Sequence, residues 1–383
     1  MSGDLKPNLE AILIDINHHF INIDKYRQEY ALHFQKLKNV LFDKLRKTEP
    51  LKYLFNGYLL AGSCGDNLKI TLPNEFDMIF QIKFPENGLI DVVKDPGIPG
   101  NIYLDFTKVL RKIRNEKQHA TIYRHMNNWL NGKNYLIIEK FQSYLQGLFA
   151  KALEEIIGSG YFCQTKLSYS RQGPAHTIKV NVDESFSYSV DFVPGIILDG
   201  QQSVLRTKNE DQWECIPKPI FYSKSHQNVS FRSSFVNREK KLLKRKENLK
   251  NTLRFIKKFR DAHSNMGNMK SYYIKMVFLW KAVEVKGTNY WQKSLTQILL
   301  DMFASLESCL REKTLKFFWD PQLNMFDKLS SAQLQNMLIC VASGRKLLEE
   351  AALNLTMPLQ TRVYEAFGCD INQCTPLKNT AVN

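Results

Sequence analysis

The chain has 383 residues, 44% of them hydrophobic and 24% charged, a balance that indicates a globular protein and excludes a disordered or fibrous one. Its formal net charge of +15 favours a polyanionic partner, because Lys and Arg side chains that contact phosphates release condensed counterions. Charge by itself does not distinguish RNA, DNA, nucleotides and acidic membranes. The longest apolar runs, such as residues 276–280, are too short to cross a bilayer, and no secretory signal is recognisable. We therefore expect a cytoplasmic protein with no membrane partner.

The predicted elements begin with one or two long helices over residues 8–47, which no Pro or Gly interrupts. Apolar side chains recur at helical spacing from Leu37 to Leu45. Three lysines project from an adjacent face, and they form either a solvated surface or one edge of a phosphate-binding surface: Lys36, Lys44 and Lys47.

A turn of small residues at 61–65 leads into a predicted strand, in which apolar side chains occupy every second position from Phe76 to Phe84. Residues 85–100 are rich in Pro, Gly and Asp and predict a loop. Helices are predicted over residues 106–115 and 135–157. The strand pattern returns between residues 161 and 198, where Val190 and Phe192 alternate with Ser189 and Asp191.

After about residue 217 the sequence predicts mainly helices, over residues 237–263, 271–285, 289–313 and 331–352. The outline is an α+β protein. A long N-terminal helix and a lobe with a mixed sheet take up residues 1–216, and a helical lobe takes up residues 217–383.

Three carboxylates in this outline point to metal chemistry. Glu75 and Asp77 lie two apart on a strand, so their side chains share the face opposite the apolar stripe. Two adjacent carboxylates repel each other unless a cation lies between them, and Mg²⁺ prefers such hard oxygen ligands together with substrate phosphates. Asp191, on a second apolar strand, would complete a site for two metal ions about 4 Å apart.

The small-residue turn that precedes the first strand predicts a contact with a triphosphate. The backbone N–H groups around Gly62 are accessible, and the Ser63 hydroxyl adds a further donor. A Gly-Ser turn and an E-x-D pair are each weak signals, but their combination with a third carboxylate is specific.

Together these motifs resemble a known family. Gly62-Ser63, Pro73-Asn74-Glu75-Phe76-Asp77 and Ser189-Val190-Asp191 look like the signature of the cyclic GMP-AMP synthase-like receptors, which are Mab-domain nucleotidyltransferases. The similarity extends into the helical lobe, to about residue 326. The segments that carry it there are Phe231-Arg232-Ser233-Ser234-Phe235 with Glu239-Lys240, then Ile256-Lys257-Lys258-Phe259-Arg260-Asp261, and Ser271-Tyr272-Tyr273-Ile274-Lys275.

The resemblance implies a bilobal nucleotidyltransferase fold and a reaction that joins ATP and GTP into a cyclic dinucleotide, with cyclic GMP-AMP as the expected product. Glu75, Asp77 and Asp191 would be the catalytic residues and would hold two Mg²⁺ or Mn²⁺ ions. Two alternatives stay open, namely that the implied phosphate-binding lysines are surface lysines and that the implied stacking tyrosine is a core residue. The nucleotide-binding residues implied are Gly62, Ser63, Arg232, Ser234, Glu239, Lys257, Ser271, Tyr272 and Lys275.

The resemblance also implies an innate immune sensor that nucleic acid activates and whose product STING receives. The vertebrate DNA sensor of the family carries a His/Cys zinc insertion, whereas this chain has a basic run at residues 240–247, and its seven cysteines show no C-x-x-C spacing. We therefore expect no structural zinc and a double-stranded RNA activator rather than double-stranded DNA, with a ligand-induced dimer left open. The activator would be contacted by the three helix lysines named above and by four further residues: Lys240, Lys241, Lys244 and Arg245.

Two other functions stay open at this point. The protein could be a catalytically silent Mab-fold module that binds nucleic acid or protein, although a silent fold has no reason to cluster three carboxylates. It could also be the same enzyme with DNA or another ligand as its trigger.

Overall fold

The computed structural model describes residues 8–22, 24–205, 211–218, 228–285, 287 and 289–371. Contacts within the fold divide the chain into two compact units. The sheet unit consists of Tyr26–Asn67 and Pro73–Lys240, and the helical unit of the described parts of Met1–Lys25, Leu68–Leu72 and Lys241–Asn383. The predicted α+β class is confirmed. The lobe boundary predicted between residues 216 and 217 stays a prediction, whereas the contacts change unit between Lys240 and Lys241.

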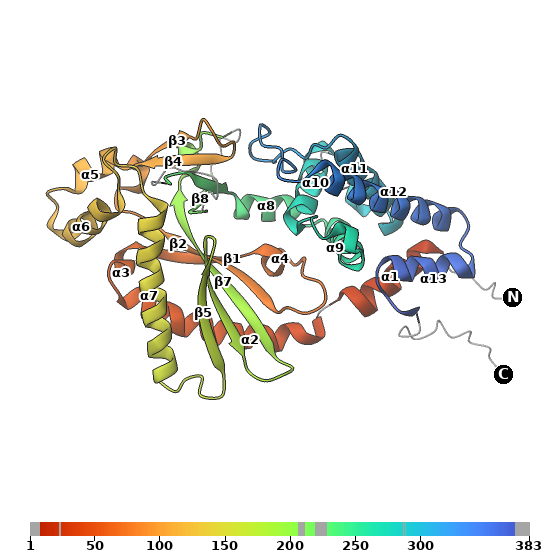
Figure 1. Cartoon of the computed structure of the whole chain (residues 1–383), viewed down its shortest axis with the longest axis horizontal. Helices are drawn as coiled ribbons and strands as arrows, with labels where there is room; N and C mark the ends of the chain where they lie inside the picture. The colour runs from red at the N-terminus through yellow and green to blue at the C-terminus, as the bar shows by residue number, and fades with distance from the viewer. Residues whose placement is uncertain are drawn as a thin grey trace. The chain divides into compact units, whose positions relative to one another are not determined.

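The sheet unit is built on a mixed sheet whose main path runs β1-β2-β7-β8-β9-β4-β3, with β5 and β6 attached through β7 (Figure 1). The neighbours β2 and β7 run parallel, and the other paired strands are antiparallel. The strands are β1 Phe55–Ala61, β2 Glu75–Ile82, β3 Asp91–Lys94, β4 Asn101–Asp105, β5 Lys166–Gln172, β6 Ala175–Asn181, β7 Ser187–Leu198, β8 Trp213–Ile216 and β9 Phe231–Ser234.

Two long helices, α2 (Asp24–Lys47) and α7 (Ile138–Gly158), cover one face of this sheet (Figure 1). Phe34 of α2 stacks on Phe76 of β2 with ring centroids 4.3 Å apart. Phe149 of α7 contacts Phe80 and Phe192, at 5.4 and 5.8 Å between centroids. Burial of these rings favours folding, at about 25 cal/mol per Å² of apolar surface removed from water. The apolar stripe predicted on β2 is therefore the covered face.

Several elements differ from the prediction; among them, the predicted helix 289–313 is a short η6 (Asn289–Gln292) followed by α11 (Leu295–Arg311). The predicted loop 85–100 contains η2 (Asn87–Leu89) and the edge strand β3, and β9 lies in a region predicted to be mainly helical. The predicted helix 237–263 is two helices, α8 (Val236–Leu243) and α9 (Glu247–Ala262), because Arg245 adopts a left-handed φ of 59° that a continuous helix excludes. A helix that was not predicted, α6, lies at Ala120–Trp129. The remaining helices of this unit are α3 Leu51–Leu54, α4 Gly62–Gly65, α5 Thr107–Ile113, η3 Lys117–His119 and η4 Gly200–Gln202.

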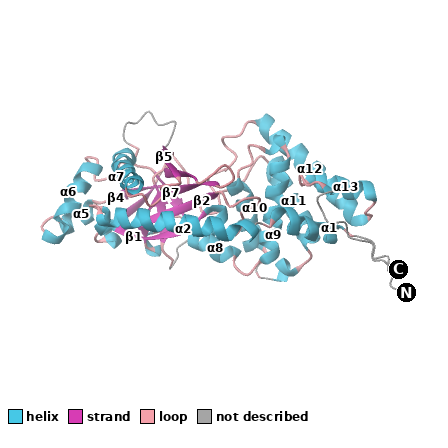
Figure 2. Ribbon diagram, turned by 90° about the horizontal axis from the view of Figure 1, so that it is seen from below, coloured by secondary structure: helices cyan, strands magenta, loops and turns pink. Residues whose placement is uncertain are grey.

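The helical unit packs long helices against one another (Figure 2). Gly344 of α12 allows close approach, because a Cβ at that position would lie 2.6 Å from the ring of Phe259 in α9 and 3.2 Å from the ring of Phe303 in α11. Within the described residues, no helix is long and apolar enough to span a membrane. The elements are α1 Leu9–Ile16, a π-helix η1 Asn17–Ile21, α9, η5 Ser264–Met266, α10 Ser271–Glu284, η6 Asn289–Gln292, α11 Leu295–Arg311, α12 Ser331–Leu353 and α13 Met357–Ala366.

The helical segment predicted at 8–47 is divided between the two units. Its first part, α1, belongs to the helical unit, where the Glu10 carboxylate accepts hydrogen bonds from the backbone N–H groups of Leu295 and Thr296 at 2.9 and 2.7 Å. A carboxylate stabilises these otherwise unpaired donors at the start of α11. Its second part, α2, belongs to the sheet unit from Tyr26 onward.

Candidate active site

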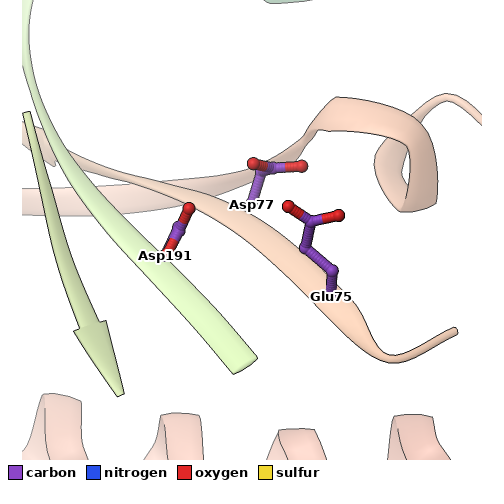
Figure 3. A group of neighbouring side chains, drawn as sticks. All are labelled: Glu75, Asp77 and Asp191. Carbon is purple, nitrogen blue, oxygen red and sulfur yellow. The ribbon is translucent and has the colours of Figure 1, made fainter. Parts of the chain in front are cut away.

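Three carboxylates converge on the face of the sheet opposite α2 and α7. Glu75 and Asp77 project from β2, and Asp191 projects from β7 directly opposite Asp77 in the parallel register (Figure 3). One ligand oxygen from each residue lies within 4.8 Å of the others. Among the described residues, this is the one group of His, Cys, Asp and Glu side chains that meets the geometric requirement for holding a metal ion.

The strand alternation explains why these side chains are available. In β2 and β7 the even-numbered residues next to the carboxylates, such as Phe76 and Val190, are buried under the helices. The carboxylates take the other face, where Glu75 is exposed and Asp77 and Asp191 are half-buried. The same alternation that builds the core therefore displays the charged groups.

The turn after β1 is fitted closely to the triad. Ala61, the last residue of β1, pairs with Asp77 of β2, and α4 begins at the next residue. Gly62 has a φ of 60°, and a Cβ on it would overlap the Asp77 carboxylate. Only glycine meets both conditions without strain. The half-buried Ser63 follows, so the predicted nucleotide-binding turn lies beside the carboxylates.

Asp191 has an electrostatic environment that favours a cation. Burial raises the pKa of the Asp191 carboxyl, and repulsion from Glu75 raises it further. A hydrogen bond of 2.6 Å donated by the Thr177 hydroxyl of β6 opposes that shift and holds one carboxylate oxygen in place. The cost of keeping three negative groups together falls when a divalent cation binds them. The donor set, all carboxylate oxygen, suits a hard ion such as Mg²⁺ or Mn²⁺.

The predicted base-contacting residues of the sheet unit lie on β9 and α8. Arg232 is half-buried and its guanidinium donates to the Pro99 carbonyl at 3.4 Å, while Ser234 is half-buried at the end of β9. The loop that carries Pro99 is held by Asp95, whose carboxylate accepts hydrogen bonds from the Gly97 N–H at 2.8 Å and the Tyr103 hydroxyl at 2.9 Å. Glu239 of α8 is buried, with 3% of its surface exposed.

The other predicted nucleotide-binding residues belong to the helical unit. Lys257 and Lys275 are buried, with 4% and 8% of their surfaces exposed, and the Lys257 ammonium donates to the Leu68 carbonyl at 2.6 Å. The alternative that they are surface lysines is therefore wrong. Tyr272 is 37% exposed, so it is not a core residue either. Ser271, at the start of α10, accepts a hydrogen bond of 2.8 Å from Arg260.

The predicted nucleic-acid contacts have different surroundings. In α2, Lys36 is exposed with its ammonium 5.2 Å from the ring centroid of Phe162, and Lys44 pairs with Glu155 at 3.0 Å. Lys240 is half-buried, and its ammonium donates a hydrogen bond to the Leu60 carbonyl within the sheet unit. The remaining four, which are exposed, are Lys47, Lys241, Lys244 and Arg245.

Two further residues of the sheet were not singled out by the sequence. Thr177 contacts Asp191, but only the β6–β7 register brings them together. Glu214 of β8 has no exposed surface and accepts a hydrogen bond of 2.8 Å from Gln81 of β2. Burial raises the pKa of Glu214 to about 7. A carboxylate within the apolar Trp213–Ile216 strand is a weak signal in the sequence, because a buried carboxyl needs a partner.

Two family models and several known proteins match this chain over most of its length. Residues 64–245 match the family model of the Mab-21 protein nucleotidyltransferase domain, and residues 248–343 match that of the Mab-21 protein HhH/H2TH-like domain. A cyclic GMP-AMP synthase-like receptor of Lucilia cuprina is 50% identical over 367 residues, which cover 95% of this chain and 98% of the relative. Cyclic GMP-AMP synthase-like receptor 2 of Drosophila melanogaster is 40% identical over 89% of this chain and 77% of its own length.

Proposed function

Because the chain belongs to the cyclic GMP-AMP synthase-like receptors, with a nucleotidyltransferase domain that implies divalent metal use, we propose that it joins ATP and GTP into cyclic GMP-AMP when nucleic acid activates it. The observation that carries this proposal is the convergence of Glu75, Asp77 and Asp191 within 4.8 Å on two adjacent strands. The protein would act as an innate immune sensor in the cytoplasm, and its product would be received by STING.

The proposed chemistry follows from the groups that the three carboxylates would hold in place, namely the metal ions and the reacting nucleotides. Bound Mg²⁺ or Mn²⁺ ions would polarise the α-phosphate of the donor nucleotide and stabilise charge on the attacking and leaving oxygens. Asp191, oriented by Thr177, accepts the proton of a ribose hydroxyl on the second nucleotide. That hydroxyl oxygen forms a bond to the α-phosphorus, the bond to the pyrophosphate oxygen breaks, and pyrophosphate leaves. A second round with the ends reversed closes the ring.

The remaining contacts would position the two nucleotides. Gly62 and Ser63 offer donors to the triphosphate beside the carboxylates. Arg232, Ser234 and Glu239 would contact a base, and Lys257 and Lys275 would neutralise phosphate charge. Tyr272, with Ser271 beside it, would stack on a base through its exposed ring.

Double-stranded RNA is the activator that we propose. The net charge of +15 supports a polyanion, and the basic run at residues 240–247 stands where the vertebrate DNA sensor has its zinc insertion. A-form RNA would be recognised by shape and phosphate contacts, through exposed basic side chains such as Lys36, Lys47, Lys241, Lys244 and Arg245. Lys44, which pairs with Glu155, would have to exchange that partner for a phosphate.

The proposal is tested by identifying the product by mass. Purified protein is incubated with ATP, GTP and Mg²⁺ or Mn²⁺, either alone or with RNA and DNA duplexes of equal length at two salt concentrations. We expect cyclic GMP-AMP with the RNA duplex, and less at the higher salt concentration. Absence of any dinucleotide under every condition would contradict the enzyme and favour a silent binding module. Product formation with DNA alone would contradict the RNA activator and keep the enzyme.

A further inference from the structure

The Leu60 carbonyl is a point where strand β1, the nucleotide-binding turn and helix α8 meet. The Lys240 ammonium of α8 donates a hydrogen bond to this carbonyl, one residue before β1 ends. A Cβ on Gly65, at the end of the turn, would overlap the same carbonyl oxygen, so the turn folds directly back on it. The position of this carbonyl therefore sets the start of the turn that carries Gly62 and Ser63.

A buried carboxylate stands near this lysine. Glu214 pairs with Ser234 across β8 and β9. Burial raises the pKa of Glu214 to about 7, and attraction to Lys240 is one of the effects that oppose this shift. One Glu214 oxygen accepts from Gln81, and the other has no hydrogen-bond partner among the described residues. Gly195 of β7 leaves room for the Glu214 side chain, because a Cβ on Gly195 would lie 3.3 Å from the Glu214 Cβ and Cγ atoms. When it is ionised, Glu214 is thus a counter-charge for the Lys240 ammonium.

We infer that Lys240 is a positioning residue for the nucleotide-binding turn, and not a contact to nucleic acid. Its ammonium holds the Leu60 carbonyl and, through it, the backbone of Gly62 and Ser63 beside the metal-binding carboxylates. Since this ammonium is engaged inside the sheet unit, its contribution to counterion release on nucleic-acid binding is small. The inference rests on the proposed nucleotidyltransferase activity.

Lys240→Met tests the inference, because it keeps the length of the side chain and removes its three donors. We expect the KM for ATP and GTP to rise roughly 10-fold, which is the size of effect that loss of a hydrogen bond from a charged donor has on an equilibrium. The change in kcat at saturating nucleotide should be smaller. The affinity for an RNA duplex and its salt dependence should stay as in the wild type. Lys240→Arg keeps donors at this position and should recover most of the nucleotide affinity.

Lys241→Met is the matched comparison, since Lys241 is the exposed neighbour in the same helix. Loss of a phosphate contact there should weaken RNA binding and reduce the salt slope by about 1. If Lys240→Met shows this behaviour, with an unchanged nucleotide KM, the inference is overturned. Glu214→Gln should raise the nucleotide KM in the same direction but less, and an unchanged KM there removes the role of the counter-charge.

Calorimetry separates this inference from the proposed function. The affinity of the full chain for a non-hydrolysable ATP analogue with Mg²⁺ is measured for the wild type and for Lys240→Met. If the wild type makes no dinucleotide, the proposed function fails, and the calorimetric comparison still decides whether Lys240 supports the nucleotide-binding turn. Equal analogue affinity in the two proteins would falsify the role of Lys240.

Discussion

Asp77 and Asp191 lie directly opposite each other on the adjacent parallel strands β2 and β7, although they are far apart in the sequence. The parallel pairing puts both side chains on one face, with Glu75 two residues before Asp77 on β2. Burial and repulsion from Glu75 raise the pKa of Asp191, so the cluster holds its charge at a cost in stability. That cost is what a bound cation removes.

Substitution of Asp77 by Asn should separate metal binding from folding. Asp77→Asn removes one negative charge from the cluster, so we expect an equal or higher melting temperature in EDTA. The stabilisation that Mg²⁺ with ATP gives the wild type should disappear, and dinucleotide formation should fall at least about 100-fold, because the metal-held phosphate loses a ligand. Thermal unfolding and product quantification measure the two effects.

The control for Asp77→Asn is RNA affinity, which should stay unchanged because the substituted side chain lies on the sheet face beside the nucleotide-binding turn. A variant that retains metal-dependent stabilisation by ATP would contradict the assignment of Asp77 as a metal ligand.

Gly62→Ala should damage the site through sterics alone. The added Cβ would overlap the Asp77 carboxylate, and the residue has a left-handed φ of 60°. We expect a loss of roughly 1 kcal/mol or more in the free energy of unfolding, together with weaker Mg²⁺–ATP binding. Chemical denaturation and calorimetry measure these quantities.

Gly147→Ala is the matched control for Gly62→Ala. Gly147 lies in α7, and a Cβ there meets nothing within 4 Å. Alanine should therefore stabilise the helix by about 0.5–1 kcal/mol without changing nucleotide affinity. A Gly62→Ala protein as stable as the wild type would show that the turn can move away from Asp77.

Thr177→Val tests the support of Asp191. Valine keeps the shape of the side chain and removes the hydroxyl that donates to the Asp191 carboxylate at 2.6 Å. Loss of such a partner costs about 10–100-fold in metal affinity, so the Mg²⁺ or Mn²⁺ concentration for half-maximal activity should rise by that factor. Thr177→Ser keeps the donor and should restore the wild-type requirement, whereas equal metal dependence in all three proteins would exclude a role for Thr177.

Glu214→Gln should change stability in a pH-dependent way. Burial raises the pKa of Glu214 from 4.5 to about 7, so the folded protein holds a proton that the unfolded chain releases between these pH values. The wild type therefore loses stability relative to Glu214→Gln as the pH rises from about 4.5 to 7, by roughly 3 kcal/mol above pH 7. Urea denaturation at pH 4.5, 6 and 8 measures the difference. A wild type that keeps or gains stability relative to Glu214→Gln as the pH rises would contradict the raised pKa of Glu214.

Local patterns in the sequence account for much of the site. Alternation along β2 places Glu75 and Asp77 on one face, and the Gly62-Ser63 turn and Asp191 follow from motif order and residue type. These features depend on neighbours in the chain, and a period of two residues or a small-residue turn is visible without any partner strand. The family likewise follows from these motifs, and the comparisons confirm it.

Only the tertiary structure decides the rest. The β2–β7 register opposes Asp77 to Asp191, and the β6–β7 register brings Thr177 to that carboxylate. The left-handed Arg245 ends α8 within a run of residues that all favour helix, and Lys240 in that helix turns inward to Leu60. Strand register and side-chain direction depend on contacts between segments distant in the sequence. A lysine has the same letter whether its ammonium faces solvent or bonds a backbone carbonyl, so no local pattern reveals which one it meets.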